Sequence, residues 1–379
     1  MAASQELGRL LSAEIFWRDR YEWLQRAGYT LRPRYDPKWE PSWKKTGKSF
    51  FKAEDGIAVV VSLPRLSLYS SDLTLAQSSK TLDAVRSKDG QIVVIKHDSK
   101  SVHPYESDIG LFFSSPPLAN DPRNHCCPVL EDMDDPYDPD RRLMVMPLLR
   151  TYNDPKFATV GEAVEFFRQI FEGLQFMHEH HVAHRDISKL NIMMDPKPIL
   201  PDLFHPQHPW YTLDAKKEVR PYTRTARPVK YYFVDFGLSR RYSAEEINPL
   251  EVPIMGGDKT VPEFQNDRET PRNPFQTDIY YMGNLIRRDF LEVYTNFKFM
   301  EPLIARMVQD DPSKRPTMDE VVSDFTKIMA KLSCWKVRER LVERRDSAFM
   351  NVLKDVHHIS ARAVPNLLSL RKAIPTWSS

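Results

Sequence analysis

Two short segments of the sequence hold side chains that suit the transfer of a phosphoryl group. HRDISKLN occupies residues 184–191 and DFG occupies residues 235–237, and each follows an apolar run that predicts a buried element. Phosphoryl transfer needs a nucleophile held in line, a divalent metal across the phosphates and positive charge opposite the departing group. Asp186 can accept the proton of a substrate hydroxyl, and Asn191 and Asp235 offer the hard oxygen ligands that Mg²⁺ prefers. These three residues are the first candidates for a catalytic site.

The positive charge must come from elsewhere in the chain. Lys96 ends the strand-like run VVIK, from which an ammonium can reach the alpha and beta phosphates of a nucleotide. A buried lysine needs a partner, and Glu106 opens ESDIGLFF, a run with helical spacing. We expect Lys96 to lie within salt-bridge reach of Glu106, with Asp108 as the weaker candidate partner.

The elements that position these residues change in type along the chain. Residues 1–55 are rich in Trp, Arg and Tyr and predict a helix followed by an irregular wrap whose aromatic side chains pack. Strand-like runs follow at residues 57–63, 72–75 and 91–96, the last one after a turn at Lys88-Asp89-Gly90 that indicates a hairpin. Beyond Pro155 the periodicity becomes helical, with capping boxes at Thr159–Glu162 and Thr317–Glu320. This order predicts an α+β fold in which a strand-rich lobe precedes a helix-rich lobe.

The two helices after these caps each have a predicted apolar face. The first face comprises Val160, Val164, Phe167, Phe171, Leu174 and Met177, and the second comprises Met318, Val321, Phe325, Ile328 and Leu332. Residues 195–230 hold seven of the 30 prolines and little periodicity, which indicates a long loop or insertion. The charged tail after residue 332 suggests one or two amphipathic helices.

Composition excludes several classes of protein. A net charge of +2 gives no long-range attraction to nucleic acid or to an anionic membrane. The three cysteines fit neither a disulfide framework nor a zinc site, and the N-terminal residues lack the apolar region of a signal peptide. The longest apolar run, IAVVVSL, is too short to span a bilayer. We expect an intracellular protein, cytoplasmic or nuclear or both, with no nucleic-acid or membrane partner; its oligomeric state stays open.

The motifs VVIK, HRDISKLN and DFG make the chain resemble the eukaryotic protein-kinase family. Val261-Pro262-Glu263 is similar to the Ala-Pro-Glu that closes the family's activation segment, Asp278 to its buried helix aspartate, and Arg315 to the arginine that pairs with the closing glutamate. The resemblance implies a two-lobed kinase fold with ATP and Mg²⁺ in the cleft. The domains it implies are an extension (1–55), a kinase-like domain (56–332) and a tail (333–379). Within the domain it implies an N-lobe (56–146), a hinge (147–150), a C-lobe (151–332) and the insertion (195–230).

The resemblance also implies roles for further residues. Met146 corresponds to the gatekeeper, and the adenine is expected to bind the carbonyl of Pro147 and the N–H of Leu149. Proline is compatible with this position, because it lacks only the backbone N–H and the adenine needs the carbonyl there. Arg185 is expected to join the catalytic loop to the activation segment, and Thr260 to contact the substrate or the catalytic loop. The candidate phosphorylation sites in the segment are Ser239, Tyr242 and Ser243.

The sequence departs from the family pattern at three places. No glycine occurs between Gly56 and Gly90, so TLAQSSKT at residues 74–81 offers only small side chains where the family has a Gly-rich loop. Ser188 occupies the position of the lysine of Ser/Thr kinases, and Lys189 follows one residue late. Asn191 and Asp235 are 44 residues apart, where the family usually has a short hairpin.

The activity we expect is transfer of the gamma phosphate of Mg-ATP to a hydroxyl of a protein substrate, with Ser/Thr as the leading acceptor. Asp186, Lys96, Lys189, Asn191 and Asp235 are the expected catalytic residues. Lys96, Glu106, Met146, Pro147, Leu149, Asn191 and Asp235 are expected to bind ATP, with Asn191 and Asp235 as the metal ligands. Two alternatives remain. The first is a pseudokinase that binds ATP or partners without turnover, and the second is a small-molecule phosphotransferase of the aminoglycoside or choline kinase type.

Overall fold

The structure is a computed structural model that describes residues 10–47, 53, 55, 80–206, 208–214, 216–254, 256–265, 267–363 and 372–377. These residues form a mixed α+β structure, so the α+β class predicted from the sequence is confirmed. The arrangement of two kinase lobes stays a prediction. The predicted strands at 57–63 and 72–75, and nearly all of TLAQSSKT, lie outside the described residues.

The chain divides into two compact units. The first comprises Met1–Val102, Val129–Leu148 and Leu200–Arg220, and the second comprises His103–Pro128, Leu149–Ile199 and Pro221–Ser379. Each unit therefore draws on three separate stretches of the sequence, and the domain boundaries expected from the sequence stay predictions.

The first unit is built on a five-stranded antiparallel sheet with strand order β1-β2-β3-β5-β4. Its strands are β1 (Tyr29–Thr30), β2 (Thr81–Arg86), β3 (Ile92–Ser99), β4 (Glu131–Asp134) and β5 (Arg141–Pro147). The hairpin predicted at Lys88-Asp89-Gly90 is confirmed, because β2 and β3 pair across it and Gly90 takes the left-handed φ of 69° that such a turn requires. The register places Lys96 opposite Met144 of β5.

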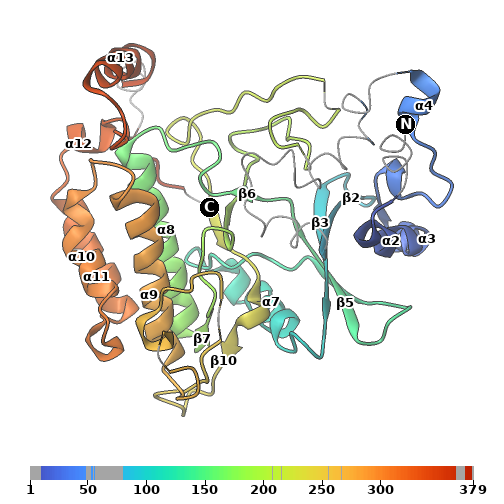
Figure 1. Cartoon of the computed structure of the whole chain (residues 1–379), viewed down its shortest axis with the longest axis horizontal. Helices are drawn as coiled ribbons and strands as arrows, with labels where there is room; N and C mark the ends of the chain where they lie inside the picture. Colours follow the sequence, from blue (N-terminus) through green and yellow to red (C-terminus); the bar gives the residue numbers. More distant parts are fainter. Residues whose placement is uncertain are drawn as a thin grey trace. The chain divides into compact units, whose positions relative to one another are not determined.

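The N-terminal extension belongs to this sheet. Its helical segments are α2 (Ser12–Asp19), α3 (Tyr21–Arg26), the 3₁₀ turn η1 (Pro33–Tyr35) and α4 (Ser42–Thr46) (Figure 1). Trp17 and Leu24 pack with Leu82, Val93 and Leu143 in one buried cluster. Trp17 is buried, which confirms for this residue the prediction that aromatic side chains of the extension pack. In addition, β1 pairs with β2 as an edge strand, which the sequence pattern did not indicate.

The second unit surrounds one long helix, α8 (Val160–Glu179). All six residues of the predicted apolar face are buried, but so are Phe166 and Phe176 outside that face, because helices and strands cover α8 on several faces. Thr159 caps the helix as predicted by accepting the N–H of Glu162, whereas the Glu162 carboxylate accepts from Ala158 instead of closing the box at Thr159.

The described part of the second unit contains six further helices, two of which, α11 (Met318–Ala330) and α12 (Cys334–Arg338), pack against α8 (Figure 1). The other four are α7 (Glu106–Ser114), α9 (Pro274–Ile286), α10 (Glu301–Met307) and α13 (Ala348–His358). Short turns of 3₁₀ or π type are η3 (Leu118–Asn120), η4 (Phe236–Leu238), η5 (Pro262–Phe264), η6 (Arg287–Leu291), η7 (Lys298–Met300), η8 (Pro312–Lys314) and η9 (Ile359–Ala363). The capping box at Thr317–Glu320 is confirmed, and Met318, Val321 and Phe325 of α11 are buried, while Ile328 and Leu332 are only half-buried.

Short strands in the second unit form the frame for the candidate catalytic residues. A three-stranded sheet has the order β6-β8-β9, and a separate pair joins β10 to β7. Their bounds are β6 (Arg150–Thr151), β7 (Val182–Ala183), β8 (Ile192–Met194), β9 (Tyr231–Phe233) and β10 (Arg240–Arg241). Between β8 and β9, the described residues 195–206, 208–214 and 216–230 contain isolated bridges but no helix and no longer strand. Among the helices that the structure describes, none has the length and apolar character needed to cross a membrane.

Candidate active site

The loop HRDISKLN runs from the end of β7 to the start of β8. Ile192 of β8 pairs antiparallel with Phe233 of β9, so Asn191 and Val234 are neighbours at the same end of the two strands. The N–H of Val234 donates to the carbonyl of Asn191 at 3.0 Å, which fixes that register one residue before Asp235. Residues 44 positions apart in the sequence are thereby brought together by two short strands.

Asp186 and Asn191 are in direct contact. Nδ2 of Asn191 donates to Oδ2 of Asp186 and to its backbone carbonyl, each at 2.8 Å. The other carboxylate oxygen, Oδ1, accepts the backbone N–H of Gly257 at 2.6 Å. Both oxygens of Asp186 are therefore oriented by donors, and each keeps capacity for another hydrogen bond because a carboxylate offers about four acceptor sites.

The electrostatics of Asp186 combine opposing effects. Burial raises the pKa of Asp186 above its ordinary value, and the nearby charge of Asp235 adds to the increase. The N–H of Gly257, the ring of His184 and the amide of Asn191 act in the opposite direction because they favour the ionised form. The arrangement thus holds a partly buried carboxylate that is a better proton acceptor than an exposed aspartate.

Asn191 also presents an oxygen suited to a metal ion. Its side chain is buried, and Oδ1 has no hydrogen-bond partner among the described residues, although Nδ2 is fully used by Asp186. A buried carbonyl oxygen without a partner is costly unless something else binds it. Mg²⁺ usually takes one or two protein oxygens and completes its shell with phosphate and water. The pair Asn191 and Asp235 offers one amide oxygen and one carboxylate, the kind of donor that such an ion takes.

The segment DFG is held by packing on both of its sides. Asp235 has a left-handed φ of 66° and accepts weakly from the N–H of Gly237, at 3.4 Å. Phe236 is buried near Phe113 of α7 and near the ring of His184. The carbonyl of Gly237 lies 3.0 Å from Nδ1 of His103. These contacts fix the backbone that carries the Asp235 carboxylate.

The backbone of the loop at residues 184–191 is fixed by Asp278 of α9. Its two carboxylate oxygens accept the N–H groups of His184 and Arg185, both at 2.7 Å. Arg185 has a left-handed φ of 67°, a conformation that costs free energy for a residue with a side chain and persists only where its surroundings impose it. Asp278 supplies that constraint, and it is a fully buried side chain on a helix, as expected from the resemblance.

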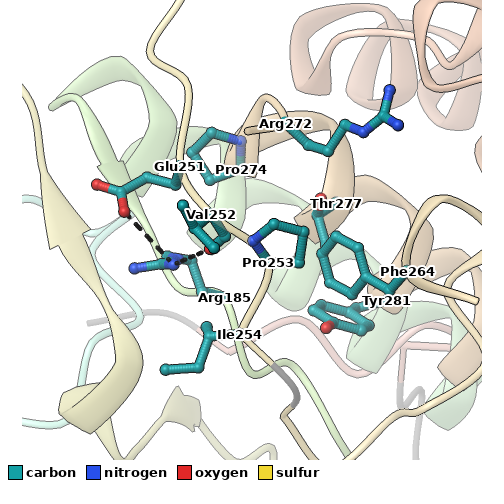
Figure 2. Close-up of a pocket in the computed structure, with 10 residues that line it drawn as sticks. All are labelled: Arg185, Glu251, Val252, Pro253, Ile254, Phe264, Arg272, Pro274, Thr277 and Tyr281. Carbon is teal, nitrogen blue, oxygen red and sulfur yellow. Dashed lines mark hydrogen bonds and ion pairs between the residues drawn. The ribbon is translucent and has the colours of Figure 1, made fainter. Parts of the chain in front are cut away.

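Arg185 joins this loop to the segment at residues 251–254. Its guanidinium donates to the carbonyls of Leu238 and Val252, each at 3.3 Å, and lies 3.6 Å from the carboxylate of Glu251. Figure 2 shows the contacts of Arg185 with Glu251 and Val252 at one side of a small pocket that is walled on the other side by Phe264, Thr277 and Tyr281. Arg185 therefore links the loop at residues 184–191 to Leu238, Glu251 and Val252, and the role of this segment as an activation segment stays a prediction.

The end of the segment is anchored by a buried ion pair. Arg315 donates to both carboxylate oxygens of Glu263, at 2.7 and 2.6 Å, and both side chains are almost fully buried. Thr260 does not contact the catalytic loop through any hydrogen bond in the described structure. Its hydroxyl instead donates to Asp258 at 2.7 Å and accepts from Asn284 at 2.9 Å.

Three of the expected site residues lie in the first unit. Lys96 is buried in β3, and its Nζ lies 3.2 Å from Oδ2 of Asp98. Met146 and Pro147 end β5 opposite Val94 and Val93. Glu106 and Leu149 belong to the second unit, so the ion pair expected between Lys96 and Glu106 and the adenine contacts stay predictions.

Within α7 the structure distinguishes the two acidic candidates. Glu106 is only 4% exposed, whereas Asp108 lies on the exposed face of the same helix. Lys189, which follows the position of the family lysine by one residue, is exposed. Ser188, which occupies that position, is half-buried. The catalytic role of Lys189 stays a prediction.

The candidate phosphorylation sites differ in access. Ser239 is fully buried and its hydroxyl donates to the carbonyl of His184 at 2.9 Å. Tyr242 has a buried hydroxyl, while Ser243 is exposed. Modification of Ser239 would require this segment to move, whereas Ser243 is accessible as it stands.

Two residues near these side chains were not indicated by the sequence analysis. Asp98 lies two residues after Lys96, and the two-residue period of a strand places both on one face, so strand periodicity was a signal that could have identified it. Gly257 lies 71 residues after Asp186 and acts through its backbone N–H. No side-chain motif marks such a donor, so only the folded structure reveals it.

Comparison with known proteins gives a distant likeness. No protein-family model matches the chain. A protein named "Light-sensor Protein kinase" from Ceratodon purpureus is 26% identical over 145 residues, a stretch that covers 35% of this chain and 9% of that protein. The chain thus spans less than a tenth of that relative's length. The match supports a distant kinase-like relationship, and it leaves activity, substrate and partners to be proposed.

Proposed function

We propose that the protein is an ATP-dependent protein kinase that transfers the gamma phosphate of Mg-ATP to a hydroxyl of a protein substrate, with Ser/Thr as the leading acceptor. The observation that carries the proposal is the contact between Asn191 and Asp186. One amide nitrogen orients the candidate base, while the oxygen of the same amide is left for a metal ion.

In this proposal Asp186 accepts the proton of the substrate hydroxyl as that oxygen bonds to the gamma phosphorus. The bond between the gamma phosphorus and the bridging oxygen of ADP breaks, so the products are a phosphorylated protein and ADP, with the proton on Asp186. A Mg²⁺ ion held by Asn191 and Asp235 would neutralise phosphate charge when bound. Lys96 is assigned to the alpha and beta phosphates, with Glu106 as its partner.

The distant kinase relative and the order of the motifs support this activity over other phosphotransferases. The pseudokinase remains the second candidate, because TLAQSSKT lacks the glycines of the family's phosphate-binding loop and because Lys189 is exposed. Both features would fit a protein that binds nucleotide without turnover.

The test is transfer of labelled gamma phosphate from Mg-ATP to the protein itself and to a mixture of Ser, Thr and Tyr peptides. Asp186→Ala and Lys96→Met are compared with wild type. Glu106→Gln on α7 is the third test variant, and its matched control is Asp108→Asn on the exposed face of the same helix. The control for Lys96→Met is Lys88→Met, at an exposed position of the hairpin before β3.

Loss of transfer in Asp186→Ala, Lys96→Met and Glu106→Gln, with the two controls active, would support the proposal. We expect a loss of at least about 100-fold in kcat for Asp186→Ala, the range typical of a general base. Metal-dependent ATP binding without transfer by the folded wild-type protein would favour the pseudokinase. Transfer to an aminoglycoside or choline, but to no peptide, would favour the small-molecule phosphotransferase.

A further inference from the structure

The one Gly-Gly pair in the sequence, Gly256-Gly257, lies against the candidate base. The backbone N–H of Gly257 reaches Oδ1 of Asp186 at 2.6 Å, a short distance typical of a hydrogen bond to a charged acceptor. A Cβ atom built on Gly256 would lie 2.3 Å from the same oxygen and 3.0 Å from the carboxylate carbon. No side chain fits at residue 256 without moving either the segment or the carboxylate.

Backbone conformation does not explain these glycines. The described glycines with a left-handed φ are Gly28, Gly47 and Gly90, whereas Gly256 and Gly257 have φ values that any residue can adopt. The requirement for glycine at residue 256 therefore arises from the close approach to Asp186. The same approach is what brings the N–H of Gly257 within hydrogen-bond distance.

The Gly-Gly pair is anchored on its C-terminal side. Asp258 accepts the N–H and the hydroxyl of Thr260, at 2.9 and 2.7 Å, and also accepts from the fully buried amide of Asn284 in α9. Ahead of the pair, Arg185 binds the carbonyl of Val252. The N–H of Gly257 is thus presented by a backbone fixed to the catalytic loop and to α9.

We propose that Gly256 and Gly257 form a positioning element for Asp186, in which the N–H of Gly257 holds the carboxylate and the absent side chain of Gly256 permits the approach. The inference rests on the proposed kinase activity. Asn191 and Gly257 then hold the two oxygens of Asp186 from different parts of the chain, so the carboxylate keeps one rotamer when a substrate hydroxyl arrives. A displacement of about 1 Å at a reacting group can cost about 100-fold in rate.

Three variants distinguish the effect of the Gly257 N–H from the effect of the missing side chain at Gly256. Gly257→Pro removes the donor, and Gly256→Ala places a methyl group against Asp186. Gly257→Ala keeps the donor, and its Cβ would meet the Ser188 side chain at 3.3 Å, a contact that needs only a small shift. We expect kcat to fall about 100-fold in the first two and by no more than about threefold in Gly257→Ala. ATP affinity by direct titration and the KM for peptide should stay as in wild type, and thermal unfolding should show that all three are folded.

A double-mutant cycle tests whether Gly257 acts through Asp186. In the Asp186→Ala background, Gly257→Pro should cause no further loss of the residual transfer. An equal loss in both backgrounds, or a loss in Gly257→Ala as large as that in Gly257→Pro, would overturn the proposal.

A measurement that does not need activity separates this inference from the proposed function. In protein labelled with ¹⁵N-glycine, the Gly257 amide is assigned by its absence from Gly257→Ala. A proton shifted downfield in wild type that moves upfield in Asp186→Asn would establish the contact even if wild type transfers no phosphate. An ordinary shift that is unchanged in Asp186→Asn would refute the inference, whatever the activity.

Discussion

The side chain of Asn191 donates from Nδ2 to Oδ2 of Asp186 at 2.8 Å, while its own Oδ1 is buried without a hydrogen-bond partner among the described residues. The two polar atoms of a single amide therefore serve two different parts of the candidate site. Its nitrogen orients the proton acceptor, and its oxygen is available to a metal ion.

Replacing Asn191 with Ala should reduce both functions at once. We expect kcat for phosphate transfer to fall at least about 100-fold, and the Mg²⁺ concentration for half-maximal rate to rise, because the base loses an orienting donor and the metal loses a ligand. A titration of activity against Mg²⁺ measures both quantities. Asn120→Ala, at an exposed turn, is the control. An Asn191→Ala protein with wild-type Mg²⁺ dependence would contradict the assignment of Oδ1.

The ion pair between Glu263 and Arg315 should be a strong determinant of stability. Both side chains are buried, at 3% and 0% exposure, so removing one partner leaves an uncompensated charge. Glu263→Gln or Arg315→Met should each lower the free energy of unfolding by about 3–5 kcal/mol. Urea unfolding measures this loss.

The double variant of that pair should be more stable than the sum of the two single losses predicts, because neither charge is then left alone. The exposed pair Lys327–Asp324 is the control, and breaking it should cost less than about 1 kcal/mol. Additive losses in the Glu263 and Arg315 cycle would show that the two residues do not stabilise each other.

His125 should make the protein less stable at acidic pH. Burial lowers the pKa of His125 to about 3, against about 6.5 in the unfolded chain. Its Nδ1 donates to the carbonyl of Tyr231 at 2.8 Å, and the Glu172 carboxylate is 4.0 Å away and partly exposed, so burial dominates. Between these two pKa values the unfolded state binds the extra proton, and stability therefore falls as the pH falls below about 6.5.

The contribution of His125 should approach about 1.4 kcal/mol for each pH unit in that range. Urea unfolding at pH 7.0 and pH 5.5 measures the change. His125→Asn keeps a donor for Tyr231 and cannot titrate, so its stability should depend less steeply on pH than that of wild type. Equal slopes in the two proteins would refute the assignment to His125.

The N-terminal extension should be required for the stability of the first unit. Trp17 is 2% exposed and packs against the sheet, and the neighbouring Arg20 donates to the buried Asp135 at 2.7 Å. Trp17→Ala should lower the free energy of unfolding by about 3–5 kcal/mol through the lost burial and the cavity left behind. Trp335→Ala, which removes a tryptophan that is 74% exposed, should have little effect. A Trp17→Ala protein with the stability of wild type would mean that packing of the extension against the sheet does not stabilise the first unit.

The sequence by itself determined the elements that depend on neighbours along the chain. The hairpin at Gly90, the cap at Thr317 and the buried faces of α8 and α11 follow from turn chemistry, capping and periodicity, which act over a few residues. The same local information identified Asp186, Asn191 and Asp235 as residues at the ends of buried elements. Those signals need no knowledge of the rest of the fold.

Only the tertiary structure decided which distant groups meet. It joined the N-terminal strand β1 to the hairpin, turned Glu106 inward and Asp108 outward, and brought the N–H of Gly257 to Asp186. A backbone donor carries no residue signature, and a two-residue edge strand has too short a pattern to detect. Such contacts form only when packing holds segments together that are far apart in sequence, and so residue types along the chain cannot specify them in advance.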